Sequence, residues 1–229
     1  MAEYLFPPAP VFALSVVGQD AQIPLRRIFC VGRNYVAHAA EMGGTVDRAA
    51  PWYFTKSACH AVHGHGMLPY PPGTSDYHHE VELALAIGAP LFQATPEQAA
   101  QAIYAYGVAL DMTRRDRQQE GKDHSRPWDL GKDVEGGAVF APMTPAAQVG
   151  PLGDKRIHLQ VNGVARQEAR LGDMVWSCPE ILAHLSGFYH LQPGDVVLTG
   201  TPAGVGAVQP GDRITGGIDG LSPIDVTLA

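Results

Sequence analysis

Two glutamates one residue apart, Glu80 and Glu82, begin an apolar run that ends at Gly88. Large apolar side chains alternate with small residues along this run, which predicts a β-strand with both carboxylates on its small-residue face. A strand rises about 3.3 Å per residue, so the two acids project the same way roughly 6 to 7 Å apart at the backbone. Paired anions among small apolar neighbours repel each other unless a cation joins them. The spacing therefore indicates a divalent-metal site, although such alternation is equally typical of the solvent face of an edge strand.

A third carboxylate, Asp111, fits the same arrangement. It lies near the end of a second strand-like run over residues 106–112, in which Gly107 and Ala109 share its face. Three oxygen ligands without cysteine suit a hard cation such as Mg²⁺, Mn²⁺ or Ca²⁺, with water and substrate completing the coordination.

The composition limits the class of protein. The chain has 229 residues, a net charge of −7 and no cluster of basic residues, which predicts one domain without a nucleic-acid-binding surface. No apolar run reaches the length of a membrane span. The three cysteines are far apart and form no CxxC pair, which indicates a reduced, cytoplasmic protein. We expect a short N-terminal extension over residues 1–25 and a main domain over residues 26–229.

Strands are expected to dominate the fold. Residues 27–32 and the two acid-bearing runs have strand patterns, and Asn162-Gly163 is the type I′ turn signal of a hairpin over residues 157–168. Short apolar runs broken by prolines suggest an edge hairpin over residues 6–22. Many strands with two or three helices predict an α+β fold with a large mixed sheet.

Three helices are expected between these strands. Thr95 followed by Pro96 marks a helix start, and this helix should run to about Tyr104. Residues 35–42 have helical composition, and residues 179–190 show an amphipathic pattern.

Other segments carry weaker signals. The polar segment 114–129 is expected to be a loop or a short helix, and the His- and Pro-rich segment 59–73 a loop. The glycine-rich run 200–206 is either a tight turn or a loop that offers backbone N–H groups to a carboxylate, and it lacks the pattern of a nucleotide-phosphate loop. Within segment 59–73 nothing fixes ligand geometry for zinc, despite the suggestive spacing of His60, His63 and His65.

Taken together, the motifs resemble the fumarylacetoacetate hydrolase family, and within it the acylpyruvate and fumarylpyruvate hydrolases. The matches run in the family's order from near residue 26 to the C-terminus. They are Gly32-Arg33-Asn34-Tyr35 with His38 and Glu41, Phe54-Thr55-Lys56, His78-His79-Glu80-Val81-Glu82, Leu110-Asp111-Met112-Thr113 with Arg115 and Gln118, Gly131-Lys132, Val161-Asn162-Gly163 and Leu198 to Gly206. Val134 departs from the phenylalanine common in the family at this position, which bears on pocket shape.

The resemblance implies a mixed-sheet β-roll of the α+β class, a homodimer and a metal site. Its three metal ligands would be Glu80, Glu82 and Asp111. A lid would carry a catalytic pair, His38 and Glu41, which lie three residues apart and so on one face of a helical turn. From spacing alone, His38 would instead be a polar residue on a helix surface.

Further roles follow from the same resemblance. Lys132 is expected to stabilise the leaving enolate or to reprotonate it. A pocket for a fumaryl group needs a second cation for the distal carboxylate, for which Arg33 and Arg115 are candidates. The residues expected to bind substrate are Arg33, Lys56, Arg115, Gln118 and Thr201.

The expected activity is metal-dependent hydrolysis of a C–C bond in an acylpyruvate, a β-diketo acid, with fumarylpyruvate giving fumarate and pyruvate at the end of gentisate breakdown. The alternatives are oxaloacetate decarboxylation, or a hydratase or isomerase on the same fold. A non-catalytic, metal-stabilised binding module is a further alternative, but such a module would need neither His38 nor Glu41.

Overall fold

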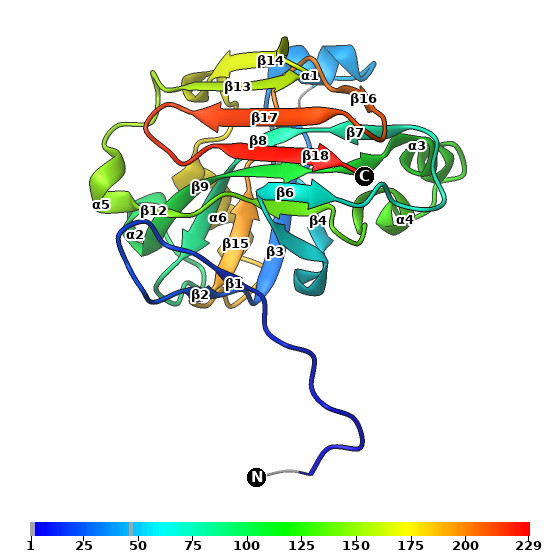
Figure 1. Cartoon of the computed structure of the whole chain (residues 1–229). Helices are drawn as coiled ribbons and strands as arrows, with labels where there is room; N and C mark the ends of the chain where they lie inside the picture. Colours follow the sequence, from blue (N-terminus) through cyan, green and yellow to red (C-terminus); the bar gives the residue numbers. More distant parts are fainter. Residues whose placement is uncertain (1–2, 46–47) are drawn as a thin grey trace.

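The computed structural model describes residues 3–45 and 48–229, which form a mixed α+β fold around one curled sheet (Figure 1). In this described part the central sheet has the order β4-β3-β15-β8-β9-β11-β5, with β12 beside β9. The pairs β3/β15 and β5/β11 are parallel and the others antiparallel. Its strands are β3 (Arg27–Val31), β4 (Tyr53–Lys56), β5 (Ala61–His63), β8 (Val81–Ile87), β9 (Ile103–Asp111), β11 (Ala138–Phe140), β12 (Thr144–Pro145) and β15 (Asp195–Leu198).

Three smaller sheets accompany the central one. The five-stranded sheet has the order β14-β13-β17-β18-β6, and β7 lies between β10 and β16 in a three-stranded sheet. The bounds are β6 (His65–Leu68), β13 (Arg156–Val161), β14 (Val164–Arg170), β17 (Arg213–Ile218), β18 (Ile224–Leu228), β7 (Tyr77–His79), β10 (Thr113–Arg114), β16 (Gly206–Val208), and the paired β1 (Ala13–Leu14) and β2 (Ile23–Pro24).

The helices are short and connect or cover the sheets (Figure 1). They are α1 (Val36–Glu41), α2 (Pro96–Ala102), α3 (Arg115–Asp123), α4 (Asp129–Lys132), α5 (Ala146–Val149) and α6 (Cys178–Ser186), with 3₁₀ turns at Ala58–His60 and Leu171–Asp173. No helix among the described residues is long and apolar enough to cross a membrane.

Strand β8 is buried along its whole length. Its large side chains, represented by Leu83 and Leu85, join the main core with residues of the five-stranded sheet and of helices α2 and α6. Its small residues, Ala84 and Ala86, join a second core on the opposite face of the curled sheet, beside further alanines of β9. The predicted alternation is therefore confirmed, and the edge-strand alternative is wrong because β8 lies between β15 and β9.

Most of the predicted elements are present. The predicted hairpin forms from β13 and β14, with Asn162 and Gly163 at positive φ, 52° and 78°. Helix α2 begins with the predicted capping box at Thr95 but ends two residues early, because β9 begins at Ile103. Helix α6 likewise ends at Ser186, before the predicted residue 190. Every predicted helix is thus present, and the larger differences are at the C-terminal ends of α2 and α6.

One segment differs from expectation. Segment 59–73 is not simply a loop, because β5 pairs with β11 and β6 with β18, both in parallel. Those partners lie far along the chain, so local composition does not reveal the pairing. Segment 114–129, expected to be a loop or a short helix, contains the short helix α3.

The N-terminal residues contribute to the body of the fold. A hairpin forms there, with its second strand, β2, just beyond the expected range. Leu14 and Val16 are buried, and Leu14 belongs to the second core. The boundary at residue 25 stays a prediction.

Candidate active site

Three carboxylates meet at one end of the alanine-lined face of the curled sheet. Glu80 immediately precedes β8, Glu82 lies within it, and Asp111 ends β9, whose backbone N–H donates to the Glu80 carbonyl at 2.9 Å. One carboxylate oxygen from each residue lies within 4.8 Å of the others, and all three residues are buried. The two strands thus assemble three oxygen donors that suit a hard divalent cation.

Basic side chains compensate two of these acids. Lys132 Nζ donates to Glu80 Oε2 at 2.8 Å, to Asp111 Oδ2 at 2.7 Å and to the Thr113 hydroxyl at 2.8 Å. Lys56 Nζ lies 2.9 Å from Asp111 Oδ1, and the Arg115 guanidinium donates to Glu80 Oε1. All three N–H groups of Lys132 are therefore in use within the cluster.

Glu82 lacks such a cationic partner and accepts a 2.7 Å hydrogen bond from the Gly200 backbone N–H. Burial, reinforced by the neighbouring Asp111 and Glu80 carboxylates, raises the pKa of Glu82 well above its ordinary value. Burial would also raise the pKa of Glu80, but Lys132 and Arg115 outweigh it and the pKa is lowered. A buried acid that its neighbours make hard to ionise is a position where a metal cation fits.

A histidine–glutamate pair lies on α1. His38 Nδ1 is 3.2 Å from Glu41 Oε2, and the Gly204 backbone N–H donates to Glu41 Oε1 at 3.0 Å. Burial lowers the pKa of His38, against the raising effects of Glu80 and Glu41. With Nδ1 donating to the carboxylate, the Nε2 lone pair is left to accept a proton. His38 is only 5% exposed, so the alternative of a helix-surface histidine is wrong.

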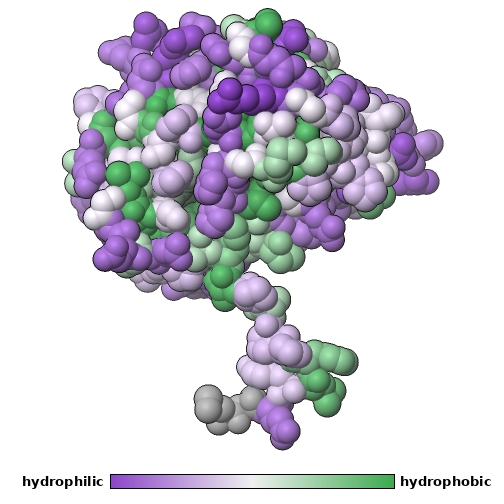
Figure 2. All heavy atoms as spheres, in the orientation of Figure 1, coloured by the Kyte–Doolittle hydropathy of each residue, from purple (hydrophilic) through white to green (hydrophobic). Residues whose placement is uncertain are grey.

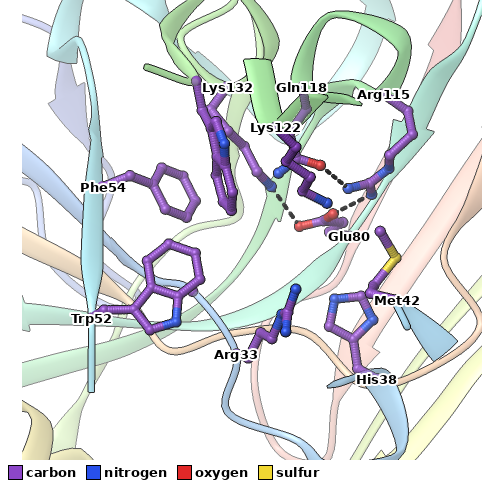
Figure 3. Close-up of a pocket in the computed structure, with 12 residues that line it drawn as sticks. Arg33, His38, Met42, Trp52, Phe54, Glu80, Arg115, Gln118, Lys122 and Lys132 are labelled. Atoms are coloured by element: carbon purple, nitrogen blue, oxygen red, sulfur yellow. Dashed lines mark hydrogen bonds and ion pairs between the residues drawn. The ribbon is translucent and has the colours of Figure 1, made fainter. Parts of the chain in front are cut away.

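One pocket gathers most of the predicted residues (Figure 3). His38 and Arg33 face Glu80, Arg115, Gln118 and Lys132 across it, and three aromatic side chains form part of its wall. The pocket residues that sequence reasoning missed are Met42, Trp52, Lys122 and Trp128.

The missed Lys122 had a usable signal. Arg115, Gln118 and Lys122 are spaced three and four residues apart, which places them on one face of a helix. Segment 114–129 was predicted as a loop or a short helix, and only the helical alternative places Lys122 beside Arg115 and Gln118.

Two predicted substrate-binding residues lie outside the pocket wall. Lys56, on β4, donates to the Met112 carbonyl at 3.0 Å and forms an ion pair with Asp111. The Thr201 hydroxyl donates to the Val81 carbonyl and accepts from Gln167, both at 2.8 Å. Both side chains therefore support the residues around the acids from within the protein.

Four other histidines, His60, His63, His65 and His79, contact side chains outside the acid cluster. His60 contacts Asp133 at 2.8 Å, and His79 contacts Gln167 at 3.0 Å. His63 stacks on His65 with ring centroids 5.9 Å apart. Among the described residues these side chains form no metal-ligating group.

The comparisons with known proteins agree with this fold. The family profile "Fumarylacetoacetate (FAA) hydrolase C-terminal" matches residues 27–229. The chain belongs to the fumarylacetoacetate hydrolase family.

Three of the matching relatives and structures have a named activity. The chain is 46% identical to a fumarylpyruvate hydrolase from Ralstonia over 82% of this chain and 98% of the relative. It is 41% identical to an oxaloacetate tautomerase from Escherichia coli K12, over 87% and 91%. A crystal structure of fumarylpyruvate hydrolase from Pseudomonas aeruginosa with Mn²⁺ and pyruvate matches with a TM-score of 0.95 and 43% identity, covering 99% of both chains.

We predict that Glu82→Gln separates the metal site from the fold. Saturating Mn²⁺ or Mg²⁺ should raise the melting temperature of the wild type by about 5–10 °C when the metal exceeds its Kd about 100-fold. The variant should lose this rise, yet in EDTA melt at least as high as the wild type, because the substitution removes an acid whose ionisation is opposed by burial. Thermal melts with and without metal test this, with the exposed Glu135→Gln as control. An unchanged metal response in Glu82→Gln would contradict the site.

We also predict the titration of His38. Its folded pKa lies below the ordinary 6.5, and Glu41→Gln should lower it further because the carboxylate favours the imidazolium. NMR titration of the His38 ring in metal-free wild type and Glu41→Gln measures both midpoints. A midpoint that stays fixed or rises in the variant would show that the pair does not interact as described.

Proposed function

We propose that this protein is a metal-dependent hydrolase of acylpyruvates, which cleaves fumarylpyruvate to fumarate and pyruvate in aromatic catabolism. The observation that carries the proposal is one cation-lined pocket, to which the histidine–glutamate pair contributes His38 and the three-acid cluster contributes Glu80. The 46% identity to a fumarylpyruvate hydrolase supports the substrate.

Glu80, Glu82 and Asp111 would hold the metal ion. Mg²⁺ and Mn²⁺ both accept such oxygens, as does Ca²⁺, and Mn²⁺ is the ion in the related Pseudomonas aeruginosa structure. When bound, the ion would supply Lewis-acid stabilisation of negative charge on the pyruvate part of the substrate.

The proton chemistry belongs to His38. Its Nε2 takes a proton from water, and the resulting hydroxide attacks the carbonyl at C4, next to the bond that breaks. The C3–C4 electron pair moves into the pyruvate enolate, and the proton held by His38 returns to C3. Glu41 stabilises the imidazolium between these two steps. One water is consumed, and fumarate and pyruvate leave.

Lys132 has a narrower role than the two considered from the sequence. Its pKa is raised, because Asp111 and Glu80 outweigh the lowering effect of burial, and its three N–H groups already have acceptors. We assign it charge compensation and positioning of the acids rather than protonation of C3.

A second candidate function is favoured by a specific relative. The 41% identity to an oxaloacetate tautomerase points to keto–enol interconversion, in which a base moves the same C3 proton without breaking a C–C bond. Oxaloacetate decarboxylation would generate the same enolate with CO₂ as the leaving group.

We predict that fumarylpyruvate is turned over faster than oxaloacetate in a Mg²⁺-supplemented assay. Enol absorbance and pyruvate release are followed for both substrates side by side. EDTA should abolish turnover, and His38→Ala should lower kcat by at least ~10², the usual contribution of a general base. Preference for oxaloacetate would instead support the second function. Near wild-type hydrolysis by His38→Ala would refute the role of the pair.

We further propose that the protein forms a homodimer and that it is located in the cytoplasm. Residues 3–11 extend away from the body as an arm (Figure 1), and Figure 2 shows hydrophobic residues on this arm. Leu5 and Phe6 are 96% and 80% exposed, an arrangement that favours cover by a second copy. The three cysteines are all free, as a reducing compartment requires.

Replacing Leu5 and Phe6 by serine tests the role of the arm in assembly. Sedimentation velocity should show a dimeric wild type. The variant should dissociate into monomers at protein concentrations at least tenfold higher than those at which the wild type dissociates. The control is Phe92→Ser, an exposed aromatic outside the arm. A wild type that is monomeric at all concentrations would overturn the homodimer. A variant that matches the wild type would show that the arm does not hold it.

A further inference from the structure

Four cationic side chains line the pocket, and they fall into two pairs. Arg115 donates to Glu80 and to Gln118, and Lys132 is held by the acid cluster, so their charges are already compensated. Arg33 and Lys122 face the same pocket, and within the described part of the chain neither has an ion-pair or hydrogen-bond partner. Two uncompensated cations remain for something that enters the pocket.

Lys122 is held over the pocket by helix α3. It lies one turn after Gln118, is half-buried, and places Nζ 5.3 Å from the centroid of the Trp128 ring. Burial lowers its pKa, and the nearby Arg115 and Arg33 lower it further. An anion seated between these cations would relieve that repulsion.

Arg33 is positioned by a close approach of the backbone. It follows strand β3, and a Cβ atom added to Gly44, beyond the end of α1, would lie 2.1 Å from Arg33 Nη1. Any side chain at residue 44 would therefore displace the guanidinium. Glycine at this position leaves the space in which Arg33 reaches the pocket (Figure 3).

Part of the pocket wall is aromatic, formed by Trp52, Phe54 and Trp128. The Trp52 and Trp128 rings meet edge to face at 5.1 Å, and Phe54 lies within 6.5 Å of each. Such a wall presents flat apolar surface to a planar, unsaturated chain.

We propose that Arg33 and Lys122 bind the distal carboxylate of the substrate, so that the site selects acylpyruvates whose acyl group ends in a second carboxylate. This inference rests on the proposed function and refines it. The expectation that Arg115 shares this task is replaced, because Glu80 and Gln118 occupy its guanidinium. The acyl chain lies along the aromatic wall, with its pyruvate end toward the acids.

Substrate pairs that differ in the distal charge test the proposal. Lys122→Gln and Arg33→Gln should each lower kcat/KM for fumarylpyruvate by about 10–100-fold, the scale of a lost hydrogen bond to a charged group. For acetylpyruvate and for the distal methyl ester of fumarylpyruvate, the change should stay within about threefold, since no distal charge is lost. Lys122→Arg should restore most of the fumarylpyruvate rate.

The matched control is Arg117→Gln, which removes a positive charge from the exposed side of the same helix. Arg117→Gln should leave kcat/KM unchanged for both fumarylpyruvate and acetylpyruvate. Equal losses on fumarylpyruvate and acetylpyruvate in Lys122→Gln, or no loss on either, would overturn the assignment.

A binding measurement separates this inference from the proposed function. In calorimetry with Mn²⁺ present, the wild type should bind fumarate at least tenfold more tightly than crotonate, which has the same chain and one carboxylate. Lys122→Gln and Arg33→Gln should remove that preference. If the wild type cleaves no acylpyruvate, the proposed hydrolase activity is wrong. The preference for fumarate over crotonate then still tests whether Arg33 and Lys122 bind a second carboxylate. Equal binding of fumarate and crotonate by the wild type would overturn it.

Discussion

The site depends on the compensation of carboxylates that are removed from water. Three acids packed this closely in a sheet interior would oppose folding if each were ionised without a partner. Lys132 bridges two of them and Lys56 and Arg115 add one contact each, so the acids and bases of the cluster balance in formal charge. A divalent ion added to this balanced cluster would bring two positive charges, which an anionic ligand would offset.

Small side chains make this cluster possible. The face of β8 and β9 that leads to Glu82 and Asp111 is lined by alanine and glycine, and the opposite face by leucine and valine. The small face lets the sheet curl and brings the ends of its strands together, while the large face binds the second sheet and two helices. One alternating pattern therefore sets both the stability of the fold and the position of the acids.

The parts of this arrangement that local pattern determines were predictable. Period-two alternation located Glu80, Glu82 and Asp111 on one face, and the Asn162-Gly163 turn located a hairpin. Strands β5 and β6 were missed because their partners lie far along the chain. Segment 114–129 is polar on every side, so its pattern left a loop and a short helix open, and Lys122 was not predicted in the pocket. The placements of Lys56 and Thr201 depend on contacts between distant segments, which a single sequence does not display.

The Glu41 carboxylate makes two contacts. It lies 3.2 Å from His38 Nδ1 and accepts a hydrogen bond from the Gly204 backbone N–H. This one side chain therefore connects helix α1 to the loop that follows β15. His38 and Glu41 both lie on α1, so an outward movement of the helix would carry the pair together and break the contact between Glu41 and the Gly204 N–H. The imidazole–carboxylate pair would stay intact, while the part of the pocket wall that His38 forms would move away from the acids.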